Sequence, residues 1–375
     1  MKTAFIACGL GQIDRGFEST TRNWFFALKK CSTMEAELYS GGKTQGAFKV
    51  WSISRNGRIC RLLRGLNLIH DGCRIEQASF AFGLLPWLFH RKPRVIWFQE
   101  YTLGLCLLRW RRLFGFNYRL LYCNGAPLGP REYYRFDFIQ HLEPQSLADG
   151  LAARIPAWKM MVFPHVLPGL RTASREEGVA WRLTREIPAG AWVVLSVAAW
   201  NKHHKRIDYV LREVAAMNDP EVHLLLCGQS EAETSELRRL GEGLLGGRVH
   251  WHSLAQSEMP LAYAAADAFV LASLTEAFGL VLIESAARGL PTLAHEHPAA
   301  KFILEDPQWL GDFSRPGALA GRMTIWKADP AIARRAAALA QSIQGRFSEE
   351  TLVPQFVDLL KRVAEMDLPV KDAQS

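Results

Sequence analysis

Short apolar runs recur along the chain and alternate with segments of helical periodicity. In the first half, the runs lie at 3–9, 94–99, 118–125 and 159–165, and a helical pattern covers 18–31. In the second half, runs at 191–200, 222–228, 248–253, 268–273 and 290–295 alternate with helical patterns at 206–217 and 259–266. Continuous apolar runs of this length are typical of parallel strands buried on both faces. Strand alternating with helix, twice over, predicts an α/β protein with two doubly wound parallel sheets.

The domain boundary is predicted where this periodicity fades, near 164–178, because Pro, Gly and charged residues accumulate there. A chain of 375 residues also exceeds the usual size of a single core. We therefore expect an N-terminal Rossmann-like domain at 1–170 and a second one at 171–345. The remaining residues, 346–375, contain an amphipathic stretch at 351–366 that predicts a terminal helix.

Composition indicates a folded protein with a basic surface. Apolar residues make up 49% of the chain, charged residues 22%, and the net charge is +8. Such a surface attracts nucleotides, nucleic acid or an anionic membrane face. The chain has no run of 18 uncharged apolar residues, so we predict no segment that spans a bilayer. We interpret the first residues as a buried strand because charged residues follow closely.

The cysteines and histidines give no metal or disulfide pattern. The seven cysteines are scattered without a Cys-x-x-Cys pair, which fits reduced thiols in a cytoplasm. Histidine pairs at 250–252 and 295–297 could chelate, but each lacks an evident third ligand. We expect no metal site and no cofactor.

Two carboxylates stand out in the otherwise small or apolar stretch 272–291. Glu276 should lie in the loop after the strand at 268–273, and Glu284 on a helix that begins near Gly279 and ends at Gly289. The helix start offers free N–H groups to a phosphate, and carboxylates accept hydrogen bonds from sugar hydroxyls. The spacing alone leaves open that Glu276 is solvated and that Glu284 pairs locally.

The residues of this stretch resemble the Glu-x7-Glu signature of retaining glycosyltransferases of family four, which have the two-domain GT-B fold. The resemblance implies a donor-sugar contact for Glu276 and a nucleotide-ribose contact for Glu284. It also implies that the C-terminal helix crosses back to the first domain. Further donor-binding residues implied here are Ser273, Phe278, Gly279 and Leu280.

A basic loop follows the first strand of the second half. Cations beside a helix start can neutralise a leaving diphosphate. By the resemblance, Lys205 aligns with the family's lysine, and we predict that it is catalytic together with Glu276. The family's arginine position is occupied by Ala198 and Ala199, so the second cation is Lys202, Arg206 or a histidine of this loop.

In the first half, four residues are candidates by resemblance to the family. Gly11 and Arg15 lie in a glycine-rich loop after the first strand and are expected to face the donor. His165 follows the strand at 159–165, and Asn124 stands where many relatives carry a histidine. We predict acceptor or sugar contacts for both, and Asn124 cannot act as a base.

Two stretches combine aromatic residues with arginine, at 78–94 and 107–119. They are either core helices or an interfacial patch that reaches a lipid-linked acceptor on an anionic membrane. Nucleic acid would use similar residues, but no RNA- or DNA-binding motif is present.

The resemblance thus implies transfer of a sugar from a UDP- or GDP-linked donor to a hydroxyl, with retained configuration and no required metal. A glycan or lipid-linked acceptor in cell-surface polysaccharide synthesis is expected, for a cytoplasmic protein peripheral to the membrane. A small-molecule acceptor is the alternative. A sugar-nucleotide-binding protein without transfer activity, a phosphorylase and an epimerase also remain open.

Overall fold

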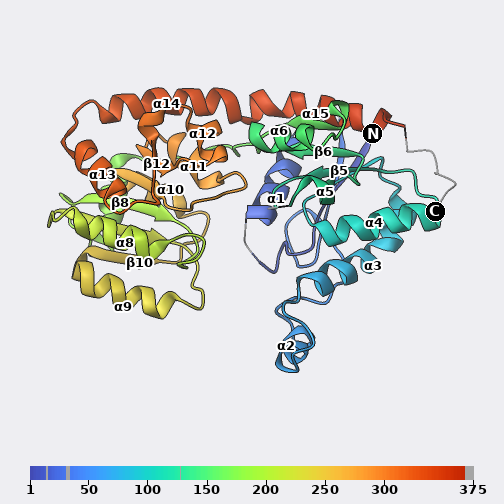
Figure 1. The fold of residues 1–375 in the computed structure, drawn as a ribbon, viewed down its shortest axis with the longest axis horizontal. Coiled ribbons are helices and arrows are strands. Elements are labelled where there is room, and N and C mark those ends of the chain that lie inside the picture. The colour runs from blue at the N-terminus through green and yellow to red at the C-terminus, as the bar shows by residue number, and fades with distance from the viewer. Residues whose placement is uncertain (14–15, 31–33, 127, 368–375) are drawn as a thin grey trace. The chain divides into compact units, whose positions relative to one another are not determined.

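The chain folds into two compact α/β units. The computed structural model describes residues 1–13, 16–30, 34–126 and 128–367 (Figure 1). The first unit comprises Met1–Pro168 together with the segment that begins at Glu349, and the second comprises Gly169–Ser348. Each unit contains one parallel sheet with helices on its faces, which confirms the predicted fold class.

The first sheet has the order β3-β2-β1-β4-β5-β6-β7, and every pairing is parallel. The strands are β1 (Lys2–Ala7), β2 (Glu35–Ser40), β3 (Ala47–Lys49), β4 (Val95–Phe98), β5 (Arg119–Cys123), β6 (Phe138–His141) and β7 (Met160–Val162). The apolar runs correctly predicted β1, β4, β5 and β7. The pattern missed β2, β3 and β6. The sequence of β2, EAELYS, opens with alternating carboxylates, since a strand near a sheet edge does not need a continuous apolar run.

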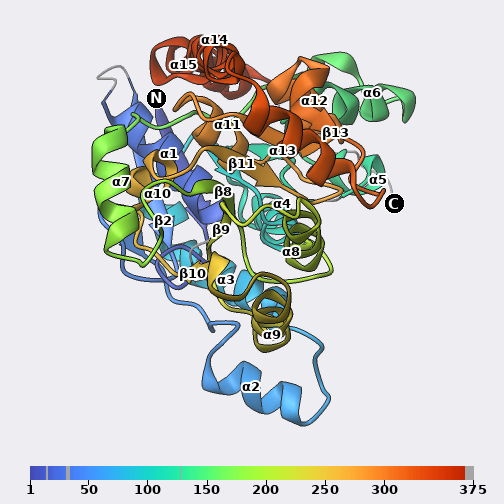
Figure 2. The ribbon, with the colours of Figure 1, turned by 90° about the vertical axis from the view of Figure 1, so that its left-hand side faces the viewer.

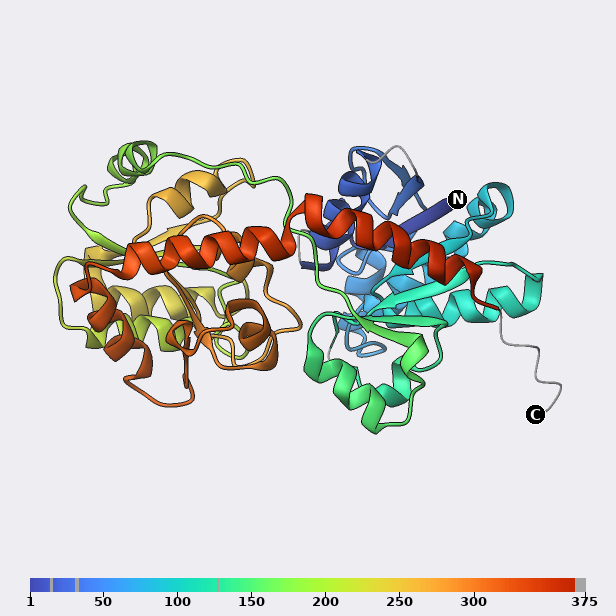
Figure 3. The same cartoon turned by 90° about the horizontal axis from the view of Figure 1, so that it is seen from above.

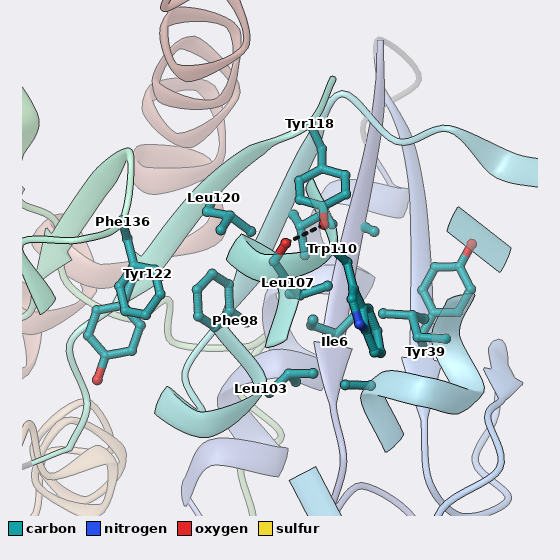
Figure 4. Packing of buried hydrophobic residues seen from close by; sticks show 14 of the residues in the cluster. Ile6, Tyr39, Phe98, Leu103, Leu107, Trp110, Tyr118, Leu120, Tyr122 and Phe136 are labelled. Atoms are coloured by element: carbon teal, nitrogen blue, oxygen red, sulfur yellow. Dashed lines mark hydrogen bonds between the residues drawn. The ribbon is translucent and has the colours of Figure 1, made fainter. Parts of the chain in front are cut away.

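Helices cover both faces of this sheet and complete its core. They are α1 (Gly16–Lys29), α2 (Arg58–Gly65), α3 (Cys73–Arg91), α4 (Tyr101–Phe114), α5 (Pro130–Tyr133), α6 (Pro144–Ala152) and α15 (Glu349–Glu365). Figure 4 shows aromatic rings from β4, β5 and the loop before β6 packed together, among them Phe98, Tyr122 and Phe136. The buried Tyr118 hydroxyl donates to the Leu107 carbonyl at 2.7 Å, so this apolar cluster leaves that polar group satisfied.

The last helix, α15, packs on the first unit (Figure 3). Phe356 is fully buried, and its ring lies against those of Phe5, Trp24 and Phe163. Burying one such side chain contributes on the order of 2–3 kcal/mol. Arg94 also donates to the carbonyl of Ala364 at 3.0 Å, which ties the end of α15 to the start of β4.

The second sheet has the order β10-β9-β8-β11-β12-β13, again wholly parallel. Helices α8, α9 and α13 lie on one side of it, and α7 and α10 on the other (Figure 2). The strands are β8 (Trp192–Val197), β9 (Val222–Cys227), β10 (Val249–His252), β11 (Ala268–Leu271), β12 (Thr292–His295) and β13 (Leu310–Gly311). The helices are α7 (Arg175–Leu183), α8 (Ile207–Ala216), α9 (Thr234–Leu245), α10 (Met259–Ala264), α11 (Leu280–Ala286), α12 (Pro298–Leu304), α13 (Ala318–Ala328) and α14 (Ile332–Phe347).

Each sheet has one point where the strand order reverses. In the first unit it lies between β1 and β4, and in the second between β8 and β11. The loops that leave two such strands diverge to opposite faces, so a crevice opens at their carboxyl ends, where ligands of open α/β sheets bind. A ligand of the second unit is therefore expected at the loops after β8 and β11.

Candidate functional site

The loops after β8 and β11 bring two of the predicted site residues together. The Lys205 ammonium donates to the Glu276 carboxylate, forming an ion pair between residues 71 positions apart in the sequence. The Lys205 side chain is 19% exposed and that of Glu276 is 11% exposed. The pair thus lies at the reversal point of the second sheet, mostly shielded from solvent.

Glu276 is held as a carboxylate by this environment. Burial acts to raise its pKa, but the charge and hydrogen bond of Lys205 and the smaller effects of its other neighbours together lower the pKa of Glu276. Ser273, fully buried just after β11, and His204 act in the same direction. An ionised acid and a cation therefore stand side by side near neutral pH.

Asn201 shapes the loop that carries Lys205, and sequence reasoning missed it. Its side-chain oxygen accepts from the backbone N–H of Lys205 at 2.7 Å and from that of His204 at 3.1 Å. Its amide nitrogen donates to Glu231 at 2.9 Å, which anchors the loop to the segment after β9. His204 Nε2 lies 3.3 Å from the Thr275 carbonyl and 3.9 Å from Glu276, so the histidine of this loop that nears the pair is His204.

Glu284 lies on α11, the helix that follows the loop carrying Glu276. Its carboxylate accepts from the Tyr263 hydroxyl at 3.0 Å. Burial raises the pKa of Glu284, against the opposing effects of that hydrogen bond and of Arg288. One oxygen is thereby occupied by tyrosine, and the carboxylate retains further acceptor capacity for a ligand.

The segment around the two acids starts its helix where the sequence predicted, but α11 ends at Ala286, three residues before the predicted Gly289. Gly279 has φ of 96° immediately before α11, and Gly289 has φ of 75° after it, both in the left-handed region that favours glycine. Leu280 is the first residue of the helix. The Phe278 side chain is buried and its ring packs against Phe347, so a donor contact from this residue would involve its backbone.

The two weaker cation candidates are engaged elsewhere in the unit. The Lys202 ammonium bonds Glu236 at 2.7 Å and lines a surface hollow with Asp208 and Arg212. Arg206 donates to the Phe313 carbonyl at 2.8 Å and lies over the Tyr209 ring. Of the cations proposed for a phosphate, Lys205 is the one that the structure pairs with Glu276.

His297 is a polar group of this region that sequence reasoning considered only as a metal ligand. It is 3% exposed, and its Nδ1 accepts from the Ala300 N–H at 3.2 Å, capping α12. Because Nδ1 accepts, the proton of the neutral ring lies on Nε2. Burial lowers the pKa of His297 to about 4, with Glu276 and Lys205 among the charges that act on it. Its Nε2 is a buried donor without a hydrogen-bond partner among the described residues.

The predicted site residues of the first unit that the structure describes lie in different loops. Gly11 has φ of 78°, and a side chain there would meet the backbone of Gly42 and Lys43 at 2.8 Å, so it permits close packing of two loops. Arg15 lies outside the described residues. Asn124 follows β5 and approaches His141 Nδ1 at 3.3 Å, and its Oδ1 is buried without a partner in the described part of the chain. Burial lowers the pKa of His165, beside Cys123, to about 3.

The reversal point of the first sheet carries a buried acid that the sequence did not indicate. Glu100, 5% exposed, accepts from the Cys8 backbone N–H at 2.9 Å, joining the ends of β4 and β1. Burial and the neighbouring Glu18 raise the pKa of Glu100 to about 7. An acid directly after a predicted strand was the available signal, but its partner became apparent only from the strand order.

The histidine pairs form no metal centre in the described residues. His295 Nδ1 lies 3.2 Å from the Gly311 carbonyl, and His250 stacks on His223. Across 1–13, 16–30, 34–126 and 128–367, no group of three or more His, Cys, Asp or Glu is arranged to hold a metal ion. Over the same residues, no helix has the length and apolarity needed to cross a bilayer.

The fold is similar to that of solved GT-B glycosyltransferases. Residues 180–342, which include Lys205, Glu276 and Glu284, match the family model of glycosyl transferases group 1. Over these residues the chain is similar to that family.

Particular relatives resemble the chain over different extents. The lipopolysaccharide core biosynthesis glycosyltransferase LpsE of Rhizobium meliloti (strain 1021) is 27% identical over 217 residues, which cover 56% of this chain and 62% of the relative. Among solved structures, Anabaena Alr3699/HepE with UDP and glucose has a TM-score of 0.77 at 18% identity, covering 96% of this chain and 99% of its own. The sucrose-phosphate synthase of Thermosynechococcus elongatus has a TM-score of 0.76 at 20% identity, covering 96% and 98%.

Proposed function

We propose that the protein transfers a sugar from a UDP- or GDP-linked donor to a hydroxyl of a glycan or lipid-linked acceptor, with retention of anomeric configuration. The observation that carries the proposal is the Lys205–Glu276 pair at the reversal point of the second sheet. The structures of HepE with UDP and with UDP-glucose support a nucleotide sugar as the ligand of this fold.

The chemistry assigned to the pair is electrostatic. An ammonium offers three donors, so the bond from Lys205 to Glu276 leaves capacity for oxygens of a leaving diphosphate. Neutralising that developing charge lowers the barrier to cleavage of the sugar–phosphate bond. Glu276 would accept hydrogen bonds from the donor sugar, Glu284 from the ribose, and the Nε2–H of His297 would donate to a sugar or phosphate oxygen.

Retention follows in this proposal from attack on the face from which the diphosphate departs. The acceptor oxygen bonds to the anomeric carbon while the bond from that carbon to the phosphate oxygen breaks. The departing phosphate takes the acceptor's proton. The proposal assigns no metal to this step, and it expects transfer to persist in EDTA.

The acceptor is proposed to be cell-surface polysaccharide or a lipid-linked glycan, reached from the cytoplasmic face of an anionic membrane. The relative LpsE is a lipopolysaccharide core biosynthesis glycosyltransferase, which supports this class of acceptor. In the first unit, α3 exposes Phe82 and Phe89, and α4 exposes Leu113 and Phe114. Both helices carry arginines, so they could approach anionic headgroups.

The test is a thermal-shift panel of UDP, GDP, ADP and their sugars on the wild type and on Glu284→Ala. A donor nucleotide should raise the Tm of the wild type, and Glu284→Ala should weaken binding about 10- to 100-fold, since a hydrogen bond to a charged group contributes about 1.5–3 kcal/mol. The matched control is Glu242→Ala, an exposed acid on α9, which should keep the full shift. If no nucleotide shifts the wild type at millimolar concentration, the donor site is refuted. A phosphorylase, which uses free phosphate, would then become the better hypothesis.

A further inference from the structure

A projecting arm of the first unit, residues 55–72, carries the helix α2. The arm leaves the domain after β3 and returns at the start of α3, and Figure 1 shows α2 beyond α3, away from the sheet. This segment was not among the stretches that the sequence indicated as interfacial.

The base of the arm is closed by specific contacts. Arg55 donates from its backbone N–H and its Nε to Glu76, which is fully buried, at 3.0 and 2.5 Å. A side chain at Gly72 would come within 2.8 Å of the Arg55 Cα, so the two ends of the arm cross closely. Arg64 donates to the Arg55 carbonyl at 2.8 Å, and Cys60 is the buried residue of α2. These contacts fix the face that α2 turns away from the domain.

The outward face of α2 is apolar. Ile59, Leu62 and Leu66 recur at the spacing i, i+3 and i+7 and are 54%, 65% and 59% exposed. Leu68, just beyond the helix, is 66% exposed, and Trp51, shortly before the arm, is 64% exposed. Single exposed leucines are ordinary on a protein surface. Within the described part of the chain, however, no other stretch of this length exposes as many large apolar side chains.

The arm is also strongly basic. It contains four arginines and a single acid, Asp71, and α2 itself has no acidic residue. Arg58 and Arg61 are exposed on the helix at positions other than the apolar row. A second copy of the same arm would be repelled by this charge, whereas an apolar row flanked by arginines suits the boundary between headgroups and acyl chains. Trp51 fits the same boundary, where tryptophan is enriched.

We propose that α2 is a membrane-docking element that inserts Ile59, Leu62, Leu66 and Leu68 into an anionic lipid surface, with Arg58 and Arg61 on the headgroups. The inference rests on the membrane association proposed above and adds α2 to the exposed faces of α3 and α4 as the element that inserts into the lipid. Vesicle binding needs no donor or acceptor, so its failure would leave sugar transfer untouched, and loss of nucleotide binding would leave docking untouched.

The test is co-sedimentation of the full-length protein with vesicles of phosphatidylcholine alone and of phosphatidylcholine with one-quarter phosphatidylglycerol. We expect binding to the anionic vesicles, weakened by salt. Leu62→Ser/Leu66→Ser should reduce binding at least about tenfold, and Arg58→Gln/Arg61→Gln about 25-fold, from a loss of roughly fivefold per arginine near an anionic surface. The matched control, Leu183→Ser/Ile325→Ser, changes two exposed apolar residues of the other unit and should bind as the wild type does.

Three results would overturn the proposal. The first is that both arm variants bind the vesicles as tightly as the wild type. The second is that the control variant loses binding to the same extent. The third is that the wild type binds neither type of vesicle, which would favour an acidic protein as the partner of the arm. Because all the substituted side chains are exposed, each variant should keep the wild-type Tm, and unchanged melting verifies that the variants fold.

Discussion

Replacing Lys205 with methionine separates the structural role of this lysine from its proposed role in transfer. The substitution removes the ammonium from a carboxylate that is 11% exposed, and its remaining titratable neighbours are His204, at 3.9 Å, and His297. Lys205 is the largest influence that lowers the pKa of Glu276, so the variant should have a raised pKa at this carboxyl.

The expected loss of stability lies between two limits. Removing one partner of a fully buried pair costs about 3–5 kcal/mol, whereas an exposed pair contributes about 0–1 kcal/mol. With side chains 19% and 11% exposed, we expect roughly 2 kcal/mol at pH 7. For a unit of the size of Gly169–Ser348, this corresponds to a decrease in Tm of about 4–8 °C.

The effect should depend on pH with a definite sign. A carboxyl whose pKa is lowered by folding stabilises the folded state above its unfolded-state pKa, and that contribution is lost as pH falls through the folded-state pKa. The Tm difference between wild type and Lys205→Met should therefore be largest near pH 7 and shrink below the usual Glu value of 4.5. Lys202→Met is the matched control, because its partner Glu236 is exposed, and it should change Tm little at any pH.

The double variant Lys205→Met/Glu276→Gln completes the cycle. It removes both charges of the pair, so it should recover most of the lost Tm. The effects of the two substitutions on stability should therefore be non-additive. Transfer activity should not recover, because the diphosphate still lacks its cation, and kcat should stay about 10²- to 10³-fold below wild type. A destabilisation equal at pH 4 and pH 7, or strictly additive effects, would refute the assignment of the ion pair.

Two further predictions concern buried groups whose contacts the sequence did not indicate. Glu100→Gln should raise stability above pH 7 and leave it unchanged below pH 4.5. Folding raises the pKa of this carboxyl from 4.5 to about 7, so the wild type loses stability as pH rises across that window, by about 3 kcal/mol at its end. Melting curves of both proteins from pH 4 to 8 measure the difference in stability, and a difference independent of pH would contradict the prediction. His297→Asn keeps a good N-cap for α12 but removes the Nε2–H donor, so it should retain the wild-type Tm and lower kcat/KM about tenfold. His297→Ala removes the cap and the donor, so it should lower both Tm and kcat/KM. Equal kcat/KM in His297→Asn and wild type would exclude a ligand contact from Nε2.

The sequence by itself determined the elements and the local backbone of the site. Apolar runs located β8, β9, β11 and β12 because strands buried on both faces are continuously apolar. The edge strand β10, VHWH, was also located although it is only half-buried. Gly279 located the start of α11 because left-handed backbone favours glycine, and this placed Glu276 in a loop and Glu284 on a helix. The end of the helix, at Ala286, came earlier than the predicted Gly289.

Only the tertiary structure decided which side chains meet. Lys202, Lys205 and Arg206 are nearly adjacent in sequence, yet Lys205 reaches Glu276, Lys202 pairs with Glu236, and Arg206 bonds a carbonyl beyond β13. That choice depends on β8 and β11 being neighbours, and strand order is a global property that periodicity does not encode. Tertiary structure also decided three other features: the burial of Phe278, the pairing of Glu100 with Cys8 and the exposure of α2. A side chain's charge, burial and partner are fixed by segments distant in the chain, and these come together only when the whole sheet has assembled.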